Sequence, residues 1–117
     1  MQTVTIWHNP RCSKSREAIN ILEKNNIKAD VVKYLDKELS TNDIQDILKL
    51  LKLSPRELMR TSEDIYKELN LKEETNDNKL ILAMAKNPKL IQRPILIKND
   101  SAIIGRPTER IAEFLNS

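Results

Sequence analysis

The 117-residue sequence holds one cysteine, one glycine, one histidine and few aromatic residues (3%). A single cysteine, Cys12, cannot close a disulfide within the chain, build a thiolate metal cage or form a CxxC redox pair. Any redox chemistry at Cys12 therefore needs a second thiol from another molecule. The sequence also lacks an apolar run of membrane-spanning length and a signal-peptide pattern, so we expect no membrane association and a location in the reducing cytoplasm.

Charge of one sign is not concentrated in any segment. The chain has 20 basic and 17 acidic residues, a net charge of +3, and no basic run with interleaved aromatic residues. This pattern argues against a nucleic-acid-binding protein. Leucine and isoleucine recur throughout, and a chain of this length fits one core. We therefore predict a single domain over residues 1–117.

The first 35 residues predict a strand, a helix and a second strand. Thr3–Trp7 is rich in β-branched residues and ends at a turn with Pro10, and Ser13–Asn25 repeats apolar residues on one helical face. The second strand-like segment holds Val31, Val32, Tyr34 and Leu35. A strand, helix and strand joined by short loops usually form a parallel, right-handed unit.

The middle of the chain predicts helices. Ser40 with Asp43, and Ser54 with Glu57, have the spacing of capping boxes, so we expect one helix after Ser40 and another from Pro55. Two more helices are predicted over Ser62–Leu69 and Thr75–Lys86, the second one stopped by Asn87-Pro88.

The last part of the chain predicts a hairpin and a helix. Apolar runs at residues 95–97 and 102–104 are separated by Lys98-Asn99-Asp100, and Gly105-Arg106-Pro107 ends the second run. A terminal helix follows with an apolar face of Ile111, Phe114 and Leu115. The order of elements predicts an α/β fold in which helices pack on a small mixed sheet.

Cys12 stands between a predicted strand and a predicted helix, in His8-Asn9-Pro10-Arg11-Cys12-Ser13-Lys14-Ser15-Arg16. Free backbone N–H groups and the dipole at a helix start stabilise an anion, which here is the thiolate or a bound oxyanion. A thiol with a pKa of about 8.5 is about 3% thiolate at pH 7, whereas a pKa of about 6.5 gives about 75%. The pattern therefore predicts a reactive thiolate at Cys12.

These residues also have structural interpretations. A free cysteine is often a small buried core residue, and Lys14 and Arg16 are typical solvated helix charges. His8 can pair with a thiolate or serve as a structural hydrogen-bonding group, and its place at a strand end leaves both open.

Three arginines, Arg60, Arg93 and Arg106, are candidates for an anion site. Taken singly, each is typical of a surface salt-bridge partner. However, Arg93 and Arg106 flank the predicted hairpin, so they can project to the same end of the sheet. Guanidinium groups suit the oxygens of a tetrahedral oxyanion. Together with Cys12, the arginines predict a site for a doubly charged anion that the thiolate can attack.

These residues resemble those of the glutaredoxin-dependent arsenate reductases and their short relatives. The matching pieces follow the family's order and spacing over nearly the whole chain: His8-Asn9-Pro10-x-Cys12-x-x-Ser15-Arg16, Leu58-x-Arg60, Arg93-Pro94-Ile95 and Arg106-Pro107-x-Glu109. Pro94 is similar to the cis-proline that lies beside the active cysteine in thioredoxin-like folds. The resemblance implies a thioredoxin-like fold with a four-stranded mixed sheet and a helical insertion in its middle.

The resemblance also implies a reaction. Cys12 would be the nucleophile, and Arg60, Arg93 and Arg106 would bind arsenate. His8 would help to keep Cys12 ionised, with Ser15 and Pro94 as supporting residues. Glutathione would displace an oxygen from the arsenic bound to Cys12, and glutaredoxin would then take the glutathione and release arsenite. A chain with one thiol must obtain electrons from external thiols. We expect glutathione as co-substrate, glutaredoxin as partner, and neither a metal nor a bound cofactor.

Two other functions fit the same fold. Spx-type regulators, which bind RNA polymerase, resemble this chain at Arg93-Pro94-Ile95 but commonly carry a CxxC switch, whereas Ser15 occupies the second cysteine position here. A glutathione-linked oxidoreductase of the monothiol glutaredoxin type would use Cys12 alone. A tripeptide thiol does not need three arginines around one sulfur, although one or two of them could hold its carboxylates.

Overall fold

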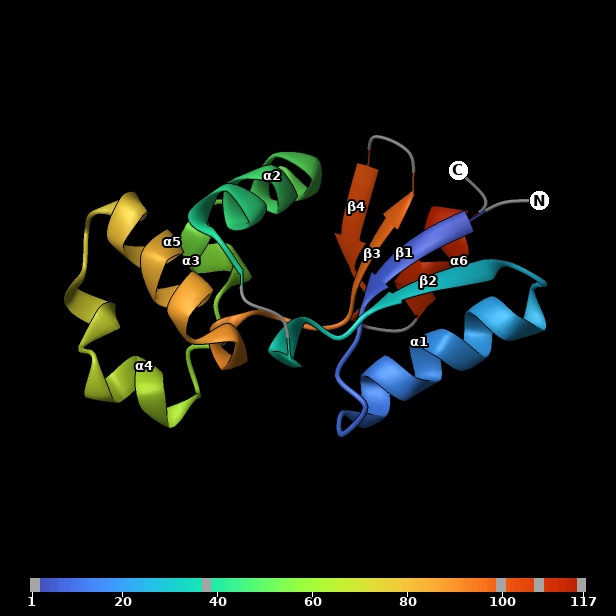
Figure 1. The fold of residues 1–117 in the computed structure, drawn as a ribbon, viewed down its shortest axis with the longest axis horizontal. Helices are drawn as coiled ribbons and strands as arrows, with labels where there is room; N and C mark the ends of the chain where they lie inside the picture. The colour runs from blue at the N-terminus through green and yellow to red at the C-terminus, as the bar shows by residue number, and fades with distance from the viewer. Residues whose placement is uncertain (1–2, 37–38, 99–100, 107–108, 116–117) are drawn as a thin grey trace. The chain divides into compact units, whose positions relative to one another are not determined.

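The computed structural model describes residues 3–36, 39–98, 101–106 and 109–115. They belong to two compact units, drawn in Figure 1. The first unit combines Met1–Asp36 with Arg93–Ser117, and the second is Lys37–Gln92. The single domain expected over residues 1–117 stays a prediction. Asn99, Asp100 and Pro107, expected in turns, lie outside the described residues.

The first unit contains a four-stranded sheet in the order β2-β1-β3-β4. Its strands are β1 (Thr3–Trp7), β2 (Lys28–Val32), β3 (Ile95–Lys98) and β4 (Ser101–Ile104). Strand β1 pairs with β2 in parallel and with β3 antiparallel, and β3 pairs with β4 antiparallel. Helix α1 (Ser13–Lys24) connects β1 to β2. The predicted strand–helix–strand unit, the hairpin and the mixed sheet are confirmed.

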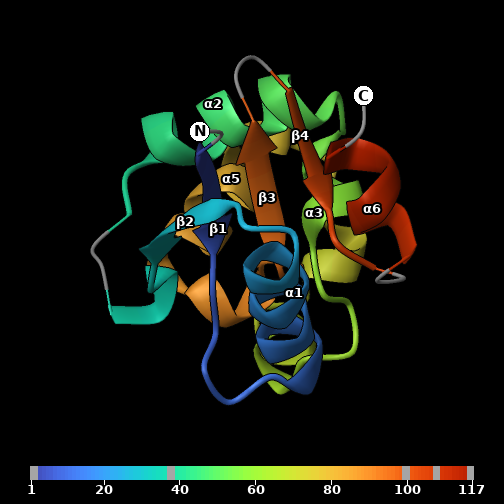
Figure 2. The same cartoon turned by 90° about the vertical axis from the view of Figure 1, so that its right-hand side faces the viewer.

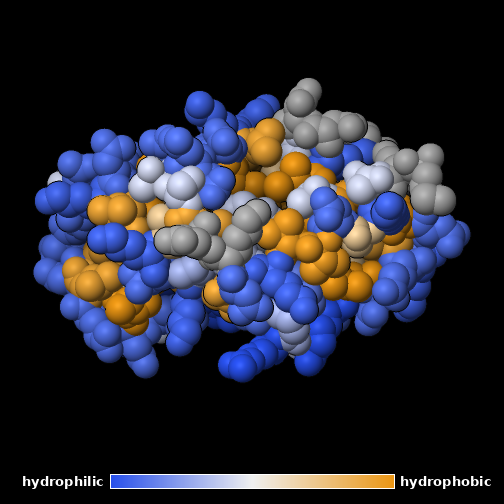
Figure 3. Space-filling view, viewed as in Figure 1, coloured by the Kyte–Doolittle hydropathy of each residue, from blue (hydrophilic) through white to orange (hydrophobic). Residues whose placement is uncertain are grey.

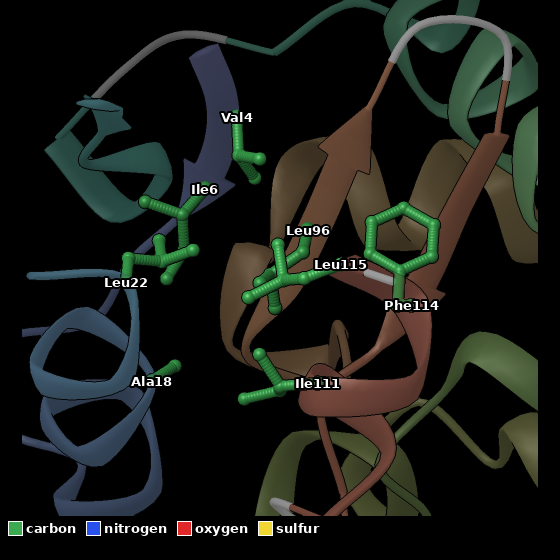
Figure 4. Close-up of a cluster of buried hydrophobic side chains, with 8 residues drawn as sticks. All are labelled: Val4, Ile6, Ala18, Leu22, Leu96, Ile111, Phe114 and Leu115. Carbon is green, nitrogen blue, oxygen red and sulfur yellow. The ribbon is translucent and has the colours of Figure 1, made fainter. Parts of the chain in front are cut away.

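Helices α1 and α6 (Glu109–Leu115) pack on the same face of this sheet, as Figures 1 and 2 show. Strands β1 and β3 and both helices contribute side chains to one cluster (Figure 4): Val4, Ile6, Ala18, Leu22, Leu96, Ile111, Phe114 and Leu115. These residues are buried because each strand turns alternate side chains to this face and each helix turns one apolar stripe to it. The cluster fixes the start of α1 against the sheet.

The second predicted strand is displaced along the chain. Strand β2 begins at Lys28 and ends at Val32, while Tyr34 and Leu35 lie in the 3₁₀ turn η1 (Tyr34–Asp36). The parallel pairing explains both limits, because Lys28 lies opposite Thr3 and Val32 lies opposite Trp7, the ends of β1. Beyond that point Tyr34 stacks on Trp7, with ring centroids 5.9 Å apart.

The second unit is helical. It comprises α2 (Thr41–Leu51), α3 (Pro55–Leu58), α4 (Asp64–Glu68), η2 (Leu71–Glu73), α5 (Asp77–Lys86) and η3 (Pro88–Leu90). Both predicted capping boxes are present, since the hydroxyls of Ser40 and Ser54 accept from the backbone of Asp43 and Glu57, whose carboxylates accept in return. Helices α4 and α5 begin two residues later than predicted, and the Asn76 side chain caps α5 by accepting from the N–H of Asn78.

Within the described residues, each helix is too short or too polar to cross a membrane.

Candidate functional site

Cys12 is the residue that caps the N-terminus of α1. The loop before it is held by backbone bonds, because the N–H of His8 donates to the carbonyl of Val32 at 2.8 Å and that of Cys12 to the carbonyl of Asn9 at 3.0 Å. The Asn9 side-chain oxygen accepts from the N–H of Arg11 at 3.0 Å. The predicted position of Cys12 at a helix start is confirmed.

Arg93 and Arg106 reach Cys12 from the hairpin. Arg93 precedes β3 and Arg106 follows β4, and the pairing of Ile95 with Ile104 brings the two arginines to one end of the sheet. Nη2 of Arg106 lies 3.4 Å from the sulfur of Cys12. The Arg93 guanidinium also acts on the thiolate as a hydrogen-bond donor. The prediction that both arginines project to the same end of the sheet is confirmed.

This environment makes Cys12 acidic. Burial raises the pKa of the thiol, but the backbone N–H of Ser15, the Arg93 and Arg106 guanidinium groups and the backbone N–H of Lys14 together outweigh burial and lower the pKa to about 7. At pH 7 about half of the molecules then carry a thiolate, whereas an unperturbed thiol is ionised to only a few per cent. The site therefore presents a nucleophilic sulfur at neutral pH.

The guanidinium groups keep donors for a further ligand. The Nε atoms of Arg93 and Arg106 are buried and have no hydrogen-bond partner among the described residues. A buried donor without a partner costs free energy, roughly 1–3 kcal/mol and more for a charged group. An oxyanion beside Cys12 would remove this cost, because its oxygens accept from guanidinium N–H groups. The site is thus suited to an anion that meets the sulfur.

His8 and Ser15 form a buried pair beneath the cysteine loop. His8 Nδ1 lies 3.1 Å from the Ser15 hydroxyl, which also accepts from the backbone N–H of Asn9 at 3.1 Å. Burial lowers the pKa of His8, and the nearby charges of Lys33 and Arg16 lower it further. These effects favour the neutral imidazole, so the geometry supports the hydrogen-bonding interpretation of His8. A role in keeping Cys12 ionised stays a prediction.

Pro94 and Gly105 join the two arginine-bearing segments. The Arg93–Pro94 peptide bond is cis, as the resemblance implied. The N–H of Gly105 donates to the Pro94 carbonyl at 2.8 Å. Neither Gly105 nor Asn9 was predicted as a site residue. Two signals could have found them: Gly105 is the single glycine of the chain and stands next to Arg106, and Asn9 is a turn-forming residue two positions after the end of β1, next to Pro10.

Arg60 lies in the second unit. Its Nε atom pairs with the Glu63 carboxylate at 3.3 Å, and its backbone N–H donates to the Leu90 carbonyl at 2.7 Å. Its Nη1 atom is buried and has no hydrogen-bond partner among the described residues. The structure thus brings together Cys12, Arg93, Arg106, His8, Ser15 and Pro94. A role for Arg60 in the same site stays a prediction.

No three His, Cys, Asp or Glu side chains in the described ranges gather in a way that could hold a metal ion. The chemistry that the first unit itself displays is that of a thiolate between two guanidinium groups at a helix start.

Known proteins are similar to this chain in sequence and fold. The family model described as the ArsC family matches residues 7–114. The chain is 49% identical to the uncharacterized protein YfgD of Escherichia coli over 114 residues, or 96% of each chain. It is 46% identical to an arsenate reductase of Neisseria meningitidis over 117 residues, covering 98% of this chain and 100% of the relative.

The solved arsenate reductase from Vibrio cholerae superposes with a TM-score of 0.92 at 44% identity, covering 96% of this chain and 97% of that one. The predicted thioredoxin-like fold is confirmed. With a family model that spans nearly the whole sequence and relatives of this similarity, the chain belongs to the ArsC family.

Proposed function

We propose that this protein is an arsenate reductase that uses Cys12 as its nucleophile and takes electrons from glutathione and glutaredoxin. The observation that carries the proposal is the Cys12 sulfur, with a pKa of about 7, 3.4 Å from Arg106 Nη2. Relatives named arsenate reductase support arsenate as the substrate.

The first step needs an ionised sulfur and a neutralised substrate. The Cys12 thiolate attacks arsenic, a sulfur–arsenic bond forms, and one oxygen leaves as water after protonation. Arg93 and Arg106 offset the negative charge that would otherwise repel the thiolate, because their donors lie at the sulfur. Arg60 would contact the same anion, as the family resemblance implies.

The later steps reduce the arsenic. A glutathione thiol displaces a second oxygen as water, which leaves arsenic bound to two sulfurs. A glutaredoxin thiolate then attacks the glutathione sulfur, and the electron pair of the broken sulfur–arsenic bond reduces arsenic from the +5 to the +3 state. Water releases arsenite from Cys12, while glutaredoxin and glutathione leave as a mixed disulfide. The chain's own residues need no bound cofactor or metal for these steps, and a lone thiol suits the reducing cytoplasm.

The test measures NADPH oxidation that depends on arsenate. Purified protein with glutathione, glutaredoxin, glutathione reductase and NADPH should oxidise NADPH when arsenate is added. Cys12→Ser should abolish this turnover, whereas Lys24→Gln, at the far end of α1, should keep it. Absence of arsenate-dependent oxidation at any arsenate concentration would overturn the proposal. Reduction of a glutathione mixed-disulfide peptide in its place would favour the monothiol oxidoreductase.

The regulatory alternative receives no support from the Cys12 loop. Ser15, at the position of the second cysteine of a redox switch, is buried and contacts His8 and Asn9 through its hydroxyl. A pull-down with RNA polymerase would test this alternative directly.

A further inference from the structure

The first turn of α1 lacks the acidic residue that the first turns of the other α-helices contain. Helices α2 to α6 each carry an acidic residue in their first turn: Asp43, Glu57, Asp64, Asp77 and Glu109. Among the described α-helices, α1 alone has no acid there, and it carries Lys14 instead, with Arg11 before it and Arg16 after it. Cations at a helix N-terminus are unfavourable by about 0.3–1 kcal/mol each. Such local conflicts typically mark a functional surface.

The exposed cations surround the Cys12 loop. The side chain of Arg16 reaches back to the Pro10 carbonyl at 3.5 Å. The bond from the N–H of His8 to Val32 holds the neighbouring Lys33 beside the same loop, and both Lys33 and Arg16 act on His8. We name the exposed residues Arg11, Lys14, Arg16 and Lys33 the basic rim.

Few acids offset the basic rim. Lys14 lies 3.8 Å from the Glu17 carboxylate, but both side chains are about half exposed (48% and 49%), so the pair is weak. Asp36 lies in the turn that begins at Lys33, where its N–H donates to the Lys33 carbonyl. Arg93 and Arg106 add two further positive charges behind the rim. Among the described residues of the first unit, the Cys12 loop is therefore surrounded by more positive charge than a small anion needs.

The rim fits a protein better than a small anion. Arg93 and Arg106 already contact the sulfur, whereas side chains exposed to water hold a small anion weakly but together attract a large acidic surface. Two exposed apolar side chains lie two positions before and after Lys33 in the chain: Val31, which is 41% exposed, and Leu35, which is 36% exposed. Figure 3 shows apolar surface at β2 with hydrophilic side chains beside it. Apolar contacts surrounded by charged groups are typical of protein interfaces.

We propose that the basic rim docks the acidic surface around the thiol of the redox protein that removes a thiol adduct from Cys12. The proposal rests on the proposed function in that electrons come from an external thiol protein. Without arsenic, glutathione can be joined directly to Cys12 as a mixed disulfide, and the partner's thiolate then attacks the glutathione sulfur. The sulfur–sulfur bond to Cys12 breaks, Cys12 leaves as the thiolate, and the partner carries the adduct.

The experiment needs no arsenate, so it stands apart from the test of the proposed function. Glutathione disulfide converts Cys12 to the glutathione mixed disulfide and releases glutathione. Its reduction is then followed with a glutaredoxin whose thiol is flanked by acidic residues and with one flanked by basic residues. The variant is Lys14→Gln/Lys33→Gln, and the matched control is Lys24→Gln/Lys28→Gln, which removes two exposed lysines from the far ends of α1 and β2.

For the acidic glutaredoxin, the second-order rate constant should fall about tenfold in the Lys14→Gln/Lys33→Gln variant at low salt. The difference should disappear near 0.5 M salt, because salt screens exposed charges at a range of roughly 4 Å there. The control variant, the basic glutaredoxin and the neutral thiol dithiothreitol should show changes below about twofold.

Three results would overturn the proposal. Equal losses in the two variants would show a general effect of net charge. An equal loss with dithiothreitol would show altered reactivity of Cys12 instead of docking. An equal loss when glutathione replaces the acidic glutaredoxin as reductant would assign the basic rim to a small anionic thiol.

Discussion

The N–H of Gly105 donates to the carbonyl of Pro94 at 2.8 Å, so the residue before Arg106 is tied to the residue after Arg93. A Cβ atom at position 105 would lie 3.0 Å from both Pro94 Cγ and Leu96 Cδ1, and 3.3 Å from Ile111 Cδ1. The absence of a side chain thus permits the close approach of the two segments that carry arginines to Cys12.

Gly105→Ala should therefore lower the free energy of unfolding and raise the pKa of Cys12. The added methyl group overpacks a buried position and should cost about 1–3 kcal/mol of unfolding free energy. The shift of Arg106 should raise the pKa of Cys12 above about 7. Urea unfolding measures the first effect and thiolate absorbance at 240 nm against pH measures the second. Asn20→Ala, at an exposed position of α1, serves as control. Lower stability with an unchanged thiol pKa would contradict a positioning role for Gly105.

Arg106→Gln should reduce the reactivity of Cys12 at neutral pH. The substitution removes a cation that lies 3.4 Å from the sulfur and lowers its pKa. If the pKa rises by about one unit, the thiolate fraction at pH 7 falls from about 50% to about 9%, and the rate of alkylation by iodoacetamide falls about fivefold.

The matched control for this substitution is Arg110→Gln, because Arg110 is exposed on α6. Its alkylation profile should follow that of the unsubstituted protein. A profile for Arg106→Gln with the same midpoint would show that Arg106 does not stabilise the thiolate in solution.

The single histidine should titrate below its ordinary pKa of about 6.5. Burial and the charges of Lys33 and Arg16 lower the pKa of His8 in the folded protein. Its contribution to stability is then fully present above the unfolded value and is lost as the pH falls through the folded value. Proton NMR of the imidazole ring should give the midpoint without ambiguity, since no other histidine is present.

The lowered pKa of His8 should also change how the free energy of unfolding depends on pH. Between pH 7 and pH 5, the unfolding free energy should fall less steeply in His8→Gln than in the parent. Both proteins should carry Cys12→Ser, because the lowered pKa of Cys12 gives its own loss of stability as the pH falls through about 7. If the unfolding free energy fell equally steeply with pH in the two proteins, a buried neutral imidazole at His8 would be contradicted.

Local patterns predicted most of the fold. Ser40 with Asp43 and Ser54 with Glu57 are complete signals within four residues, and both capping boxes are present. Strand β2 was predicted less well, because its limits are set by pairing with β1 and not by its own residues. Tyr34 looks like a strand residue in the sequence but leaves the sheet to stack on Trp7, a contact between residues 27 positions apart.

The parts of the site that lie at the ends of helices and strands were predicted, whereas the contacts between distant elements were not. The sequence indicates where helices and strands begin and end, so it places Cys12 at a helix start and the arginines at both ends of a hairpin. The bond between Gly105 and Pro94 and the pair of His8 and Ser15 depend on packing between distant elements. No spacing rule indicated that Ser15 would face His8 and Asn9, and the direction of the His8 pKa shift required the position of Lys33.

Lys98 is buried at the end of β3 and donates from Nζ to the carbonyls of Leu115, at 3.1 Å, and Phe114, at 3.4 Å. These carbonyls belong to the last turn of α6, where the helix dipole attracts a cation. The ammonium group thus holds the C-terminal turn of α6 against the sheet. A hydrogen bond to a charged group contributes about 1.5–3 kcal/mol.

Lys98→Met keeps the length and the apolar stem of the side chain but removes the ammonium group. It should lower the unfolding free energy by about 2 kcal/mol, because the Phe114 and Leu115 carbonyls lose a charged donor in a buried position. Amide hydrogen exchange should increase most in α6. Lys28→Met on exposed β2 is the matched control and should change stability by less than about 0.5 kcal/mol. Unchanged stability in Lys98→Met would show that water replaces the ammonium group at α6 without loss.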